Sequence, residues 1–299
     1  MNVFKNHPSL LPLLLIVAAV FGLDFLTRQS QGQPNMKLSS EIESKALSVL
    51  REGLRNQDPE QFWFAMHAAE GLTLGGYGEE VIEVVEPMLA TETDGQRLCG
   101  IARELARAGD REKVAVLVEV LGREDPYGHI HAAESLYKVI EVGDESVMRE
   151  RFVKDGPIKL RLMAAGALAR KNNDAAAFAF IRECLRGDEP EGIQIAAWLL
   201  AVIGEKSDIE PLRSRLPDAP EPIIRAYIEH ALASLGDEEG LRLLARNLED
   251  ADPVIRTYAA TFAGDAKAYS TQSQLEAMLD DSFLDARIRA AQTLLQLSR

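Results

Sequence analysis

The sequence predicts an all-helical α-solenoid, a protein in which pairs of helices stack side by side. Two ladders of residues with a common period of about 32 residues predict it, and a ladder of prolines agrees with them. The first ladder consists of blocks such as HAAEGL and MAAGAL, whose last residues we call frame ends: Leu72, Leu105, Leu136, Leu168, Leu200, Leu232, Ala263 and Leu294. A fixed period of this length is typical of solenoids, because one repeat cannot bury its apolar face without a neighbour.

Each repeat is expected to contain two helices. Apolar residues form the second ladder with the same period in another register, at Leu89, Leu121, Val153, Leu185, Leu216, Leu248 and Leu279. Prolines mark the start of the first helix, where the missing N–H would be unpaired in any case, at Pro59, Pro126, Pro157, Pro190, Pro222 and Pro253. Alanine pairs let the first helices approach closely, and recurring leucines fill the core. We therefore expect a right-handed solenoid of about seven repeats with a half-repeat at each end.

The two terminal half-repeats are predicted to cover the ends of the stack. At the N-terminal end, residues 39–55 form a capping helix, in which Ser40 and Glu43 have the spacing of a capping box. At the C-terminal end, a single helix runs from Asp285 to Ser298, and its outer face is expected to carry Arg287, Gln292 and Gln296. Residues 56–299 then form the solenoid, and residues 28–38 form a linker before the capping helix.

Glycine and aspartate follow the frame in several repeats, as in IARELARAGD (Ile101 to Asp110) and IEHALASLGD (Ile228 to Asp237). In this pattern the chain resembles HEAT-repeat proteins of the short bacterial type, related to the HEAT-like repeats of phycobilisome lyases. The resemblance covers about residues 56–299 and implies a solenoid fold. It implies less about function, because such repeats occur in scaffolds, chromophore lyases and a metal-dependent hydroxylase. That enzyme, deoxyhypusine hydroxylase, uses His-Glu dipeptides in several repeats, and this sequence has none.

Residues 1–27 are predicted to be a signal peptide or a membrane anchor. Lys5 precedes an uncharged apolar stretch, LLPLLLIVAAVFGL, from Leu10 to Leu23. This stretch is shorter than the ~20 residues of a membrane span and is typical of a signal-peptide core. The positive charge before it favours export of the rest of the chain, so we expect an extracytoplasmic protein, either membrane-anchored or secreted or periplasmic after cleavage. The alternative is a hydrophobic helix that caps a cytoplasmic domain, and the polar run from Arg28 to Asn35 argues against it.

The charge of the chain argues against nucleic acid as a partner, and none is expected. The 33 basic and 47 acidic residues give a net charge of 33 − 47 = −14, whereas proteins that neutralise phosphates carry a basic stripe. Residues 1–35 hold two basic residues and one acidic residue, so the rest of the chain carries −15. Cys99 and Cys184 fit neither a disulfide framework nor a CxxC metal motif.

No catalytic, cofactor-binding or metal-binding residue is predicted, because the sequence lacks GxSxG, HExxH, P-loop and GxGxxG motifs. His67 with Glu70, and His131 with Glu134, have the spacing that puts two ligands on one helical face. The two pairs lie two repeats apart, however, which separates them by roughly 20 Å at about 8 to 10 Å per helix. One metal cannot join them. We therefore interpret both histidines as partly buried packing residues. Trp198 is expected to be a core residue, and the alternative is an exposed anchor.

A row of charged residues suggests a binding surface. The concave side of a solenoid generally binds the partner, and we expect the second helices to line it. Six residues at nearly equivalent positions of successive second helices change from acidic to basic along the stack, and we call them the charged row: Glu86, Glu119, Arg151, Arg182, Arg213 and Arg246. Such a row would favour a partner with the opposite order of charges. The alternative is a solvated face whose mixed charges serve solubility.

These observations predict a non-enzymatic interaction scaffold that binds a protein partner on a concave helical surface and is exported or tethered at its N-terminus. No cofactor is expected. The alternative is an enzyme or enzyme subunit, similar to a chromophore lyase or a metal-dependent hydroxylase. Bound iron or a bound tetrapyrrole in the purified protein would favour that alternative.

Overall fold

The computed structural model describes residues 36–299. The predicted signal peptide or anchor at residues 1–27 and most of the linker at residues 28–38 lie outside the described residues. All regular structure between residues 36 and 299 is helical. No helix in this part of the chain is both long enough and apolar enough to cross a membrane.

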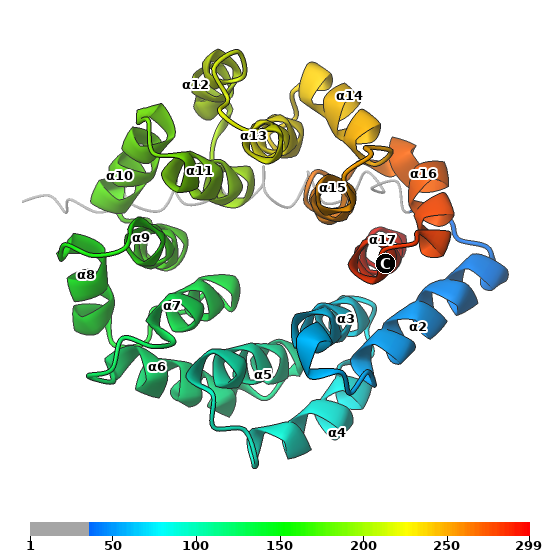
Figure 1. Ribbon diagram of the computed structural model, residues 1–299, viewed down its shortest axis with the longest axis horizontal. Coiled ribbons are helices and arrows are strands. Elements are labelled where there is room, and N and C mark those ends of the chain that lie inside the picture. The colour runs from blue at the N-terminus through cyan, green and yellow to red at the C-terminus, as the bar shows by residue number, and fades with distance from the viewer. Residues whose placement is uncertain (1–35) are drawn as a thin grey trace, which may run out of the picture. The chain divides into compact units, whose positions relative to one another are not determined.

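The helices form pairs with one inner and one outer member (Figure 1). The inner helices are α3 (Phe62–Leu74), α5 (Gly95–Ala108), α7 (His129–Lys138), α9 (Ile158–Asn172), α11 (Pro190–Ile203), α13 (Pro222–Ser234), α15 (Pro253–Asp265) and α17 (Leu284–Ser298). The outer helices are α2 (Ser40–Leu54), α4 (Gly78–Leu89), α6 (Val114–Gly122), α8 (Glu145–Val153), α10 (Ala175–Arg186), α12 (Ile209–Arg215), α14 (Glu238–Asn247) and α16 (Gln272–Ala277). Successive pairs pack against each other, as expected for a HEAT-like solenoid.

The helices begin and end at residues whose chemistry favours a boundary. Pro190 and Pro253 occupy the first turns of α11 and α15, where a missing N–H leaves nothing unpaired. Asp252 caps α15 by accepting a hydrogen bond from a backbone N–H of the first turn. Gly109 follows α5 with a φ of 126°, a conformation that residues with a Cβ rarely adopt. Pro222 also begins α13, whereas Pro126 lies before the start of α7 at His129 and Pro59 begins a short 3₁₀ helix ahead of α3. The prolines therefore mark most of the predicted helix starts, but not that of α7.

The two ends of the described chain meet and close the solenoid (Figure 1). α17 packs against α15 on one side and against α3 and α2 on the other. The backbone N–H of Met36 donates to the carbonyl oxygen of Leu297 at 2.8 Å, and Lys45 forms an ion pair with Asp280 at 2.6 Å. α17 and α2 thus form one further inner–outer pair, and we call residues 36–299 the ring.

The prediction that the terminal helices cap an open stack is therefore wrong. α2 forms where expected, although Ser39 rather than Ser40 caps it, by accepting a hydrogen bond from a backbone N–H at 3.2 Å. Gln292, expected on an outer face of the last helix, is only 3% exposed. Its side chain packs beside Gly71 of α3. Each terminal helix has an apolar face that the other end of the chain covers, so neither end needs a polar cap.

Leucines at the frame ends fill the core between inner and outer helices. Leu168 and Leu200 have no exposed surface. Replacing either with alanine is expected to lower the free energy of unfolding by about 2 to 5 kcal/mol, because buried methyl groups are lost and a cavity is left. Glu119→Ala is the surface control, since that side chain is 69% exposed. Equal shifts of the urea midpoint for all three variants would contradict the assignment of the leucines at the frame ends to the core.

A buried polar cluster lies between α13 and α14. The side-chain amide of Asn247 donates to Glu229 at 2.7 Å and lies 3.2 Å from Nε2 of His230. None of the three residues is more than 2% exposed. Burial lowers the pKa of His230 to about 3. The imidazole of His230 is therefore neutral in the folded protein at neutral pH.

Mild acid is expected to destabilise the ring through His230. The unfolded chain binds a proton at this residue below about pH 6.5, whereas the folded chain does so only near pH 3. Lowering the pH through this window therefore favours the unfolded state, by about 2 kcal/mol between pH 6.5 and pH 5. Urea unfolding of the wild type and of His230→Gln at the two pH values measures this, and the variant should lose less stability. The same pH dependence in both proteins would refute the assignment.

Candidate ligand-binding cavity

The ring encloses a central cavity of about 740 Å³, whose wall is formed by the inner helices. The outer helices lie behind them, away from the centre (Figure 1). The prediction that the second helix of each repeat lines the concave side is therefore wrong, since the first helix does. The physical reason is that the inner circle has the smaller circumference, so the alanine-rich helices, which can approach one another closely, occupy it.

The wall residues lie at fixed distances from the frame ends. Two residues before a frame end, the wall contains Glu70, Glu134, Trp198, Thr261 and Gln292. Two residues after a frame end, it contains a set that we call the plus-two layer: Leu74, Arg107, Lys138, Arg170, Val202, Asp265 and Gln296. The two positions differ by one helical turn, so each inner helix presents them on the same face. This stripe is mostly polar, charged or aromatic, whereas the remaining faces of the inner helices are rich in alanine and leucine.

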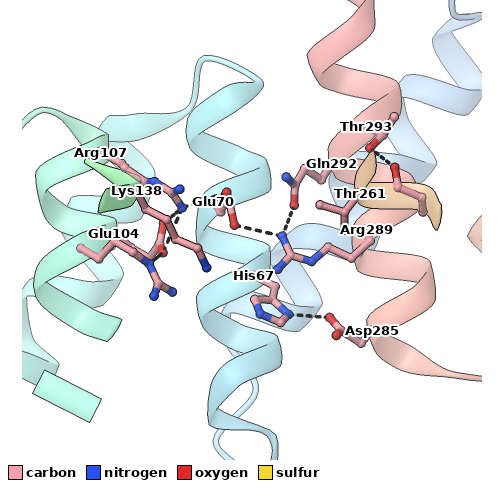
Figure 2. A network of polar contacts seen from close by, with 12 residues as sticks. His67, Glu70, Glu104, Arg107, Lys138, Thr261, Asp285, Arg289, Gln292 and Thr293 are labelled. Atoms are coloured by element: carbon pink, nitrogen blue, oxygen red, sulfur yellow. Dashed lines mark hydrogen bonds and ion pairs between the residues drawn. The ribbon is translucent and has the colours of Figure 1, made fainter. Parts of the chain in front are cut away.

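Most charges on the wall are paired, and Glu70 holds a central place among them (Figure 2). Its carboxylate lies 2.8 Å from Arg107 of α5 and 2.9 Å from Arg289 of α17. Burial opposes the ionisation of Glu70, but the two guanidinium groups outweigh it and hold its pKa well below the usual range. One carboxylate on α3 thus joins the last inner helix to the second one.

A second contact between the chain ends involves His67 of α3 and Asp285 of α17. Nδ1 of His67 lies 2.8 Å from a carboxylate oxygen of Asp285 (Figure 2). Burial and the charge of Arg289 lower the pKa of His67, so the imidazole of His67 is neutral at pH 7. A neutral imidazole donates its Nδ1–H to the carboxylate, which leaves Nε2 as an acceptor on the cavity wall.

Trp198 lies on the cavity wall rather than in the core, which corrects the expectation for this residue. It is half-buried, its ring packs edge-on against Tyr137 with centroids 5.2 Å apart, and Lys138 lies 5.3 Å from its centroid. Lys138 also forms an ion pair with Glu134 at 2.7 Å. The tryptophan therefore fixes a cation of the plus-two layer and exposes apolar surface to the cavity.

Two charged groups of the plus-two layer have no partner of opposite charge among the described residues. Arg170 of α9 donates only to the carbonyl oxygen of Tyr137, at 3.0 Å. Asp265 of α15 makes no hydrogen bond or ion pair in this part of the chain, and its carboxylate is exposed to the cavity. Enclosure by the ring raises the pKa of Asp265 to about 6, and the nearby carboxylate of Glu70 adds to the rise. The cavity wall thus carries an unfavourable negative charge at neutral pH.

Asp265→Asn is expected to stabilise the ring above pH 6. The wild-type carboxylate is ionised there against the cost of its enclosure, whereas asparagine is neutral. At pH 4.5 the folded wild type carries a protonated Asp265, so the advantage of the variant should be smaller. Melting temperatures at pH 8 and pH 4.5 measure the difference, with the exposed loop variant Asp218→Asn as control. A lower melting temperature of Asp265→Asn at pH 8 would refute the assignment.

The histidines singled out from the sequence do not come together. His67 contacts the other end of the chain, whereas His131 is half-buried and stacks on Trp63 with centroids 5.0 Å apart. His129 is buried and contacts the carbonyl oxygen of Arg123 at 3.0 Å. Among residues 36–299, no group of three or more His, Cys, Asp or Glu side chains is arranged to hold a metal ion.

The charged row lies on the outer helices, outside the cavity. Its members contact partners within their own or a neighbouring repeat: Glu86 with Lys113 at 3.3 Å, Glu119 with Arg123 at 2.9 Å, Arg151 with the Leu121 carbonyl at 3.3 Å, Arg182 with Asp208 at 2.7 Å, Arg213 with Asp237 at 2.5 Å and Arg246 with Glu229 at 3.4 Å. The row therefore follows the outside of the ring. Its role in partner binding stays a prediction.

Comparisons with known proteins concern the fold. Residues 145–233 match the family model of HEAT repeats. Among solved structures, human deoxyhypusine hydroxylase in complex with glycerol is similar, with 18% sequence identity, 86% of this chain and 97% of that chain covered, and a TM-score of 0.41. A search of curated proteins gives no significant match. The matched residues correspond to α8 through α13, and helix pairs of the same kind continue on both sides of them. The match and the succession of pairs support a HEAT-repeat protein.

Proposed function

We propose that this protein is a non-enzymatic binding scaffold, built from HEAT repeats of the short bacterial type, that takes a short extended segment of a protein partner into its central cavity. The observation that carries the proposal is the closed ring. A cavity of about 740 Å³ lies within the range typical of ligand sites, about 300 to 1,000 Å³. No folded domain fits into such a volume, but a few residues of an extended chain do.

The composition of the wall supports binding. Four of the large hydrophobic side chains that are exposed in the ring lie on the cavity wall, namely Leu74, Val202, Val254 and Tyr258. Apolar surface of this kind, next to charged groups that are already fixed by partners, is typical of sites that bind amphipathic ligands. Aromatic residues such as Tyr258 supply contact area at a small entropic cost.

Site-specific photo-crosslinking tests the proposal with two matched positions. Val202 is 38% exposed on the cavity wall, and Val153 is 67% exposed at the end of outer helix α8. A benzophenone amino acid at position 202 is expected to crosslink one short segment of a partner, identified by mass spectrometry, whereas position 153 should not. Crosslinks from position 153 but not from position 202 would show that the partner binds to the outside of the ring, and the proposal would be wrong.

The charged row supports a second contact surface for the same partner. Reversing Arg182, Arg213 and Arg246 to Glu would weaken capture and flatten its salt dependence, because exposed charges act mainly on the association rate. The contacts of these arginines with Asp208, Asp237 and Glu229 would also be lost, so a melting curve must accompany the binding assay. If the folded variant binds with unchanged affinity and salt dependence, the charged row does not contact the partner and serves only the contacts within the ring.

The apolar stretch from Leu10 to Leu23 supports export or tethering of the ring. In this proposal residues 1–27 act as a signal peptide or membrane anchor, and the ring lies outside the cytoplasm. Cell fractionation and N-terminal sequencing of the mature protein test it. A protein that keeps Met1 and stays in the cytoplasmic fraction would refute it.

An enzyme or enzyme subunit is the second candidate. The observation that favours it is the pair of unused proton-transfer groups on the wall, namely Nε2 of His67 and the carboxylate of Asp265. Stoichiometric iron, a bound tetrapyrrole or turnover of a small molecule by the purified protein would favour this candidate. Loss of that turnover in Asp265→Asn would locate it in the cavity.

A further inference from the structure

Arg170 of α9 and the hydroxyl of Tyr137 of α7 belong to residues of the cavity wall and have no negatively charged partner among the described residues. The guanidinium of Arg170 lies 5.0 Å from the centroid of the Tyr137 ring and donates to the Tyr137 carbonyl oxygen at 3.0 Å. Both contacts fix its position but neither supplies a negative charge. The hydroxyl of Tyr137 is buried in a residue that is 1% exposed, and it has no hydrogen-bond partner among the described residues. A buried hydroxyl without a partner is unfavourable and rare, so a ligand that accepts its hydrogen bond would stabilise the site.

An unpartnered carboxylate belongs to the same layer of the cavity. Asp265 of α15 lies in the plus-two layer, as Arg170 does. Enclosure raises the pKa of Asp265, and the charge of Arg170 is among those that oppose the rise. The two groups are therefore close enough to influence each other, yet they form no ion pair.

Apolar side chains lie in the same layer. Val202 is 38% exposed and Leu74 is 42% exposed, and both belong to the plus-two layer. Trp198 lies one helical turn before Val202 on α11. A methylene stem that runs between the two charges would cover this apolar surface.

We propose that the cavity binds the C-terminal residue of the partner segment, when that residue has a basic side chain. Its terminal carboxylate accepts hydrogen bonds from Arg170 and from the hydroxyl of Tyr137, its stem packs against Val202, and its cationic group contacts Asp265. This inference rests on the proposed function and specifies which end of the segment enters. Most other charges of the wall already have partners, as in the Glu70 cluster and the pair of Lys138 with Glu134. Lys159 and Glu191 also lie on the wall without an ion pair among the described residues, but both stand outside the plus-two layer. A free basic amino acid has the same chemistry, so the test includes it.

The experiment uses the full chain and a tetrapeptide library synthesised in two forms, with a free C-terminal carboxylate and with a C-terminal amide. Affinity selection followed by calorimetry on the retained peptides is expected to give free-acid peptides that end in Lys or Arg. Amidation, or replacement of the terminal Lys by norleucine, should weaken binding about tenfold or more, as is typical for loss of a hydrogen bond to a charged group. Free lysine is the small-molecule arm, and binding of lysine as tight as that of the peptides would assign the site to an amino acid instead.

Three variants separate binding from folding. Tyr137→Phe should weaken binding about tenfold without lowering the melting temperature, because the hydroxyl that it removes has no hydrogen-bond partner among the described residues. In Asp265→Asn the difference between lysine and norleucine at the C-terminus should disappear. Arg242→Gln is the control, since this arginine lies on outer helix α14 and its side chain is 65% exposed.

Two outcomes would overturn the inference. One is equal binding of free-acid and amidated peptides, and the other is an equal effect of Arg242→Gln and Tyr137→Phe. If a partner segment still crosslinks to position 202, the scaffold function stands and only the choice of a basic C-terminus fails. If no library peptide binds and no segment crosslinks to position 202, both proposals fail.

Discussion

Truncation of the chain before Leu284 is expected to loosen the helix at the opposite end of the sequence. The truncation removes α17, which packs against α2 and α3 as well as against α15. Ile288, Leu294 and Leu295 of α17 have no exposed surface, and Ile288 packs beside Gly53 of α2. Loss of these contacts should lower the local opening free energy of α2 by about 3 kcal/mol or more, so that its amides exchange roughly a hundredfold faster.

Hydrogen exchange of residues 40–54 measures this effect, and residues 145–172 provide an internal control. The control residues form α8 and α9, which pack against neither α17 nor α2 in the ring. Their protection should therefore change little, because interactions in a repeat array are mostly between neighbours. An open stack predicts the opposite pattern, with loss confined to α15 and α16. Unchanged protection in residues 40–54 would mean that the ends do not support each other.

The repeat frame could be predicted from the sequence, whereas the closure could not. Frame ends such as Leu168 and helix starts such as Pro190 are local signals, and the structure places them in the core and at a helix start as predicted. Closure depends on the small rotation between successive pairs, summed over the whole array. No single residue encodes that sum. Contacts such as His67 with Asp285 join residues far apart in the sequence, and nothing near His67 indicates its partner.

The sequence marks the cavity wall at a fixed distance from the frame ends. Arg107, Arg170 and Asp265 each stand two residues after a frame end, where a core position would carry an apolar side chain. A charged residue at a fixed place in several repeats is typical of a shared exposed surface. The order of signs in the charged row is the more visible pattern in the sequence, and it belongs to the outer helices. Which helix of each pair fits the smaller circle depends on how closely neighbouring helices approach, and the order of charges does not indicate this.

Glu70→Ala is expected to be among the most destabilising single substitutions on the cavity wall. Glu70 is the carboxylate that lies between Arg107 and Arg289, and the Arg289 side chain is only 9% exposed (Figure 2). Removing one partner of a buried ion pair leaves an uncompensated charge, which typically costs about 3 to 5 kcal/mol. Glu210→Ala is the control, since that glutamate also contacts an arginine, Arg213, but its side chain is 77% exposed.

The companion variant Glu70→Ala with Arg289→Met shows whether the loss arises from the unpaired charge. Methionine fills similar space without a charge, so the double variant should recover part of the stability that Glu70→Ala loses. Urea unfolding of both variants, with hydrogen exchange of α2 and α17, measures the free energy and locates the change. The contact of Glu70 with Arg289 joins α3 to α17, so the single variant should also weaken protection at both chain ends. Equal stability of Glu70→Ala and Glu210→Ala would show that the closure of the ring depends on apolar packing alone.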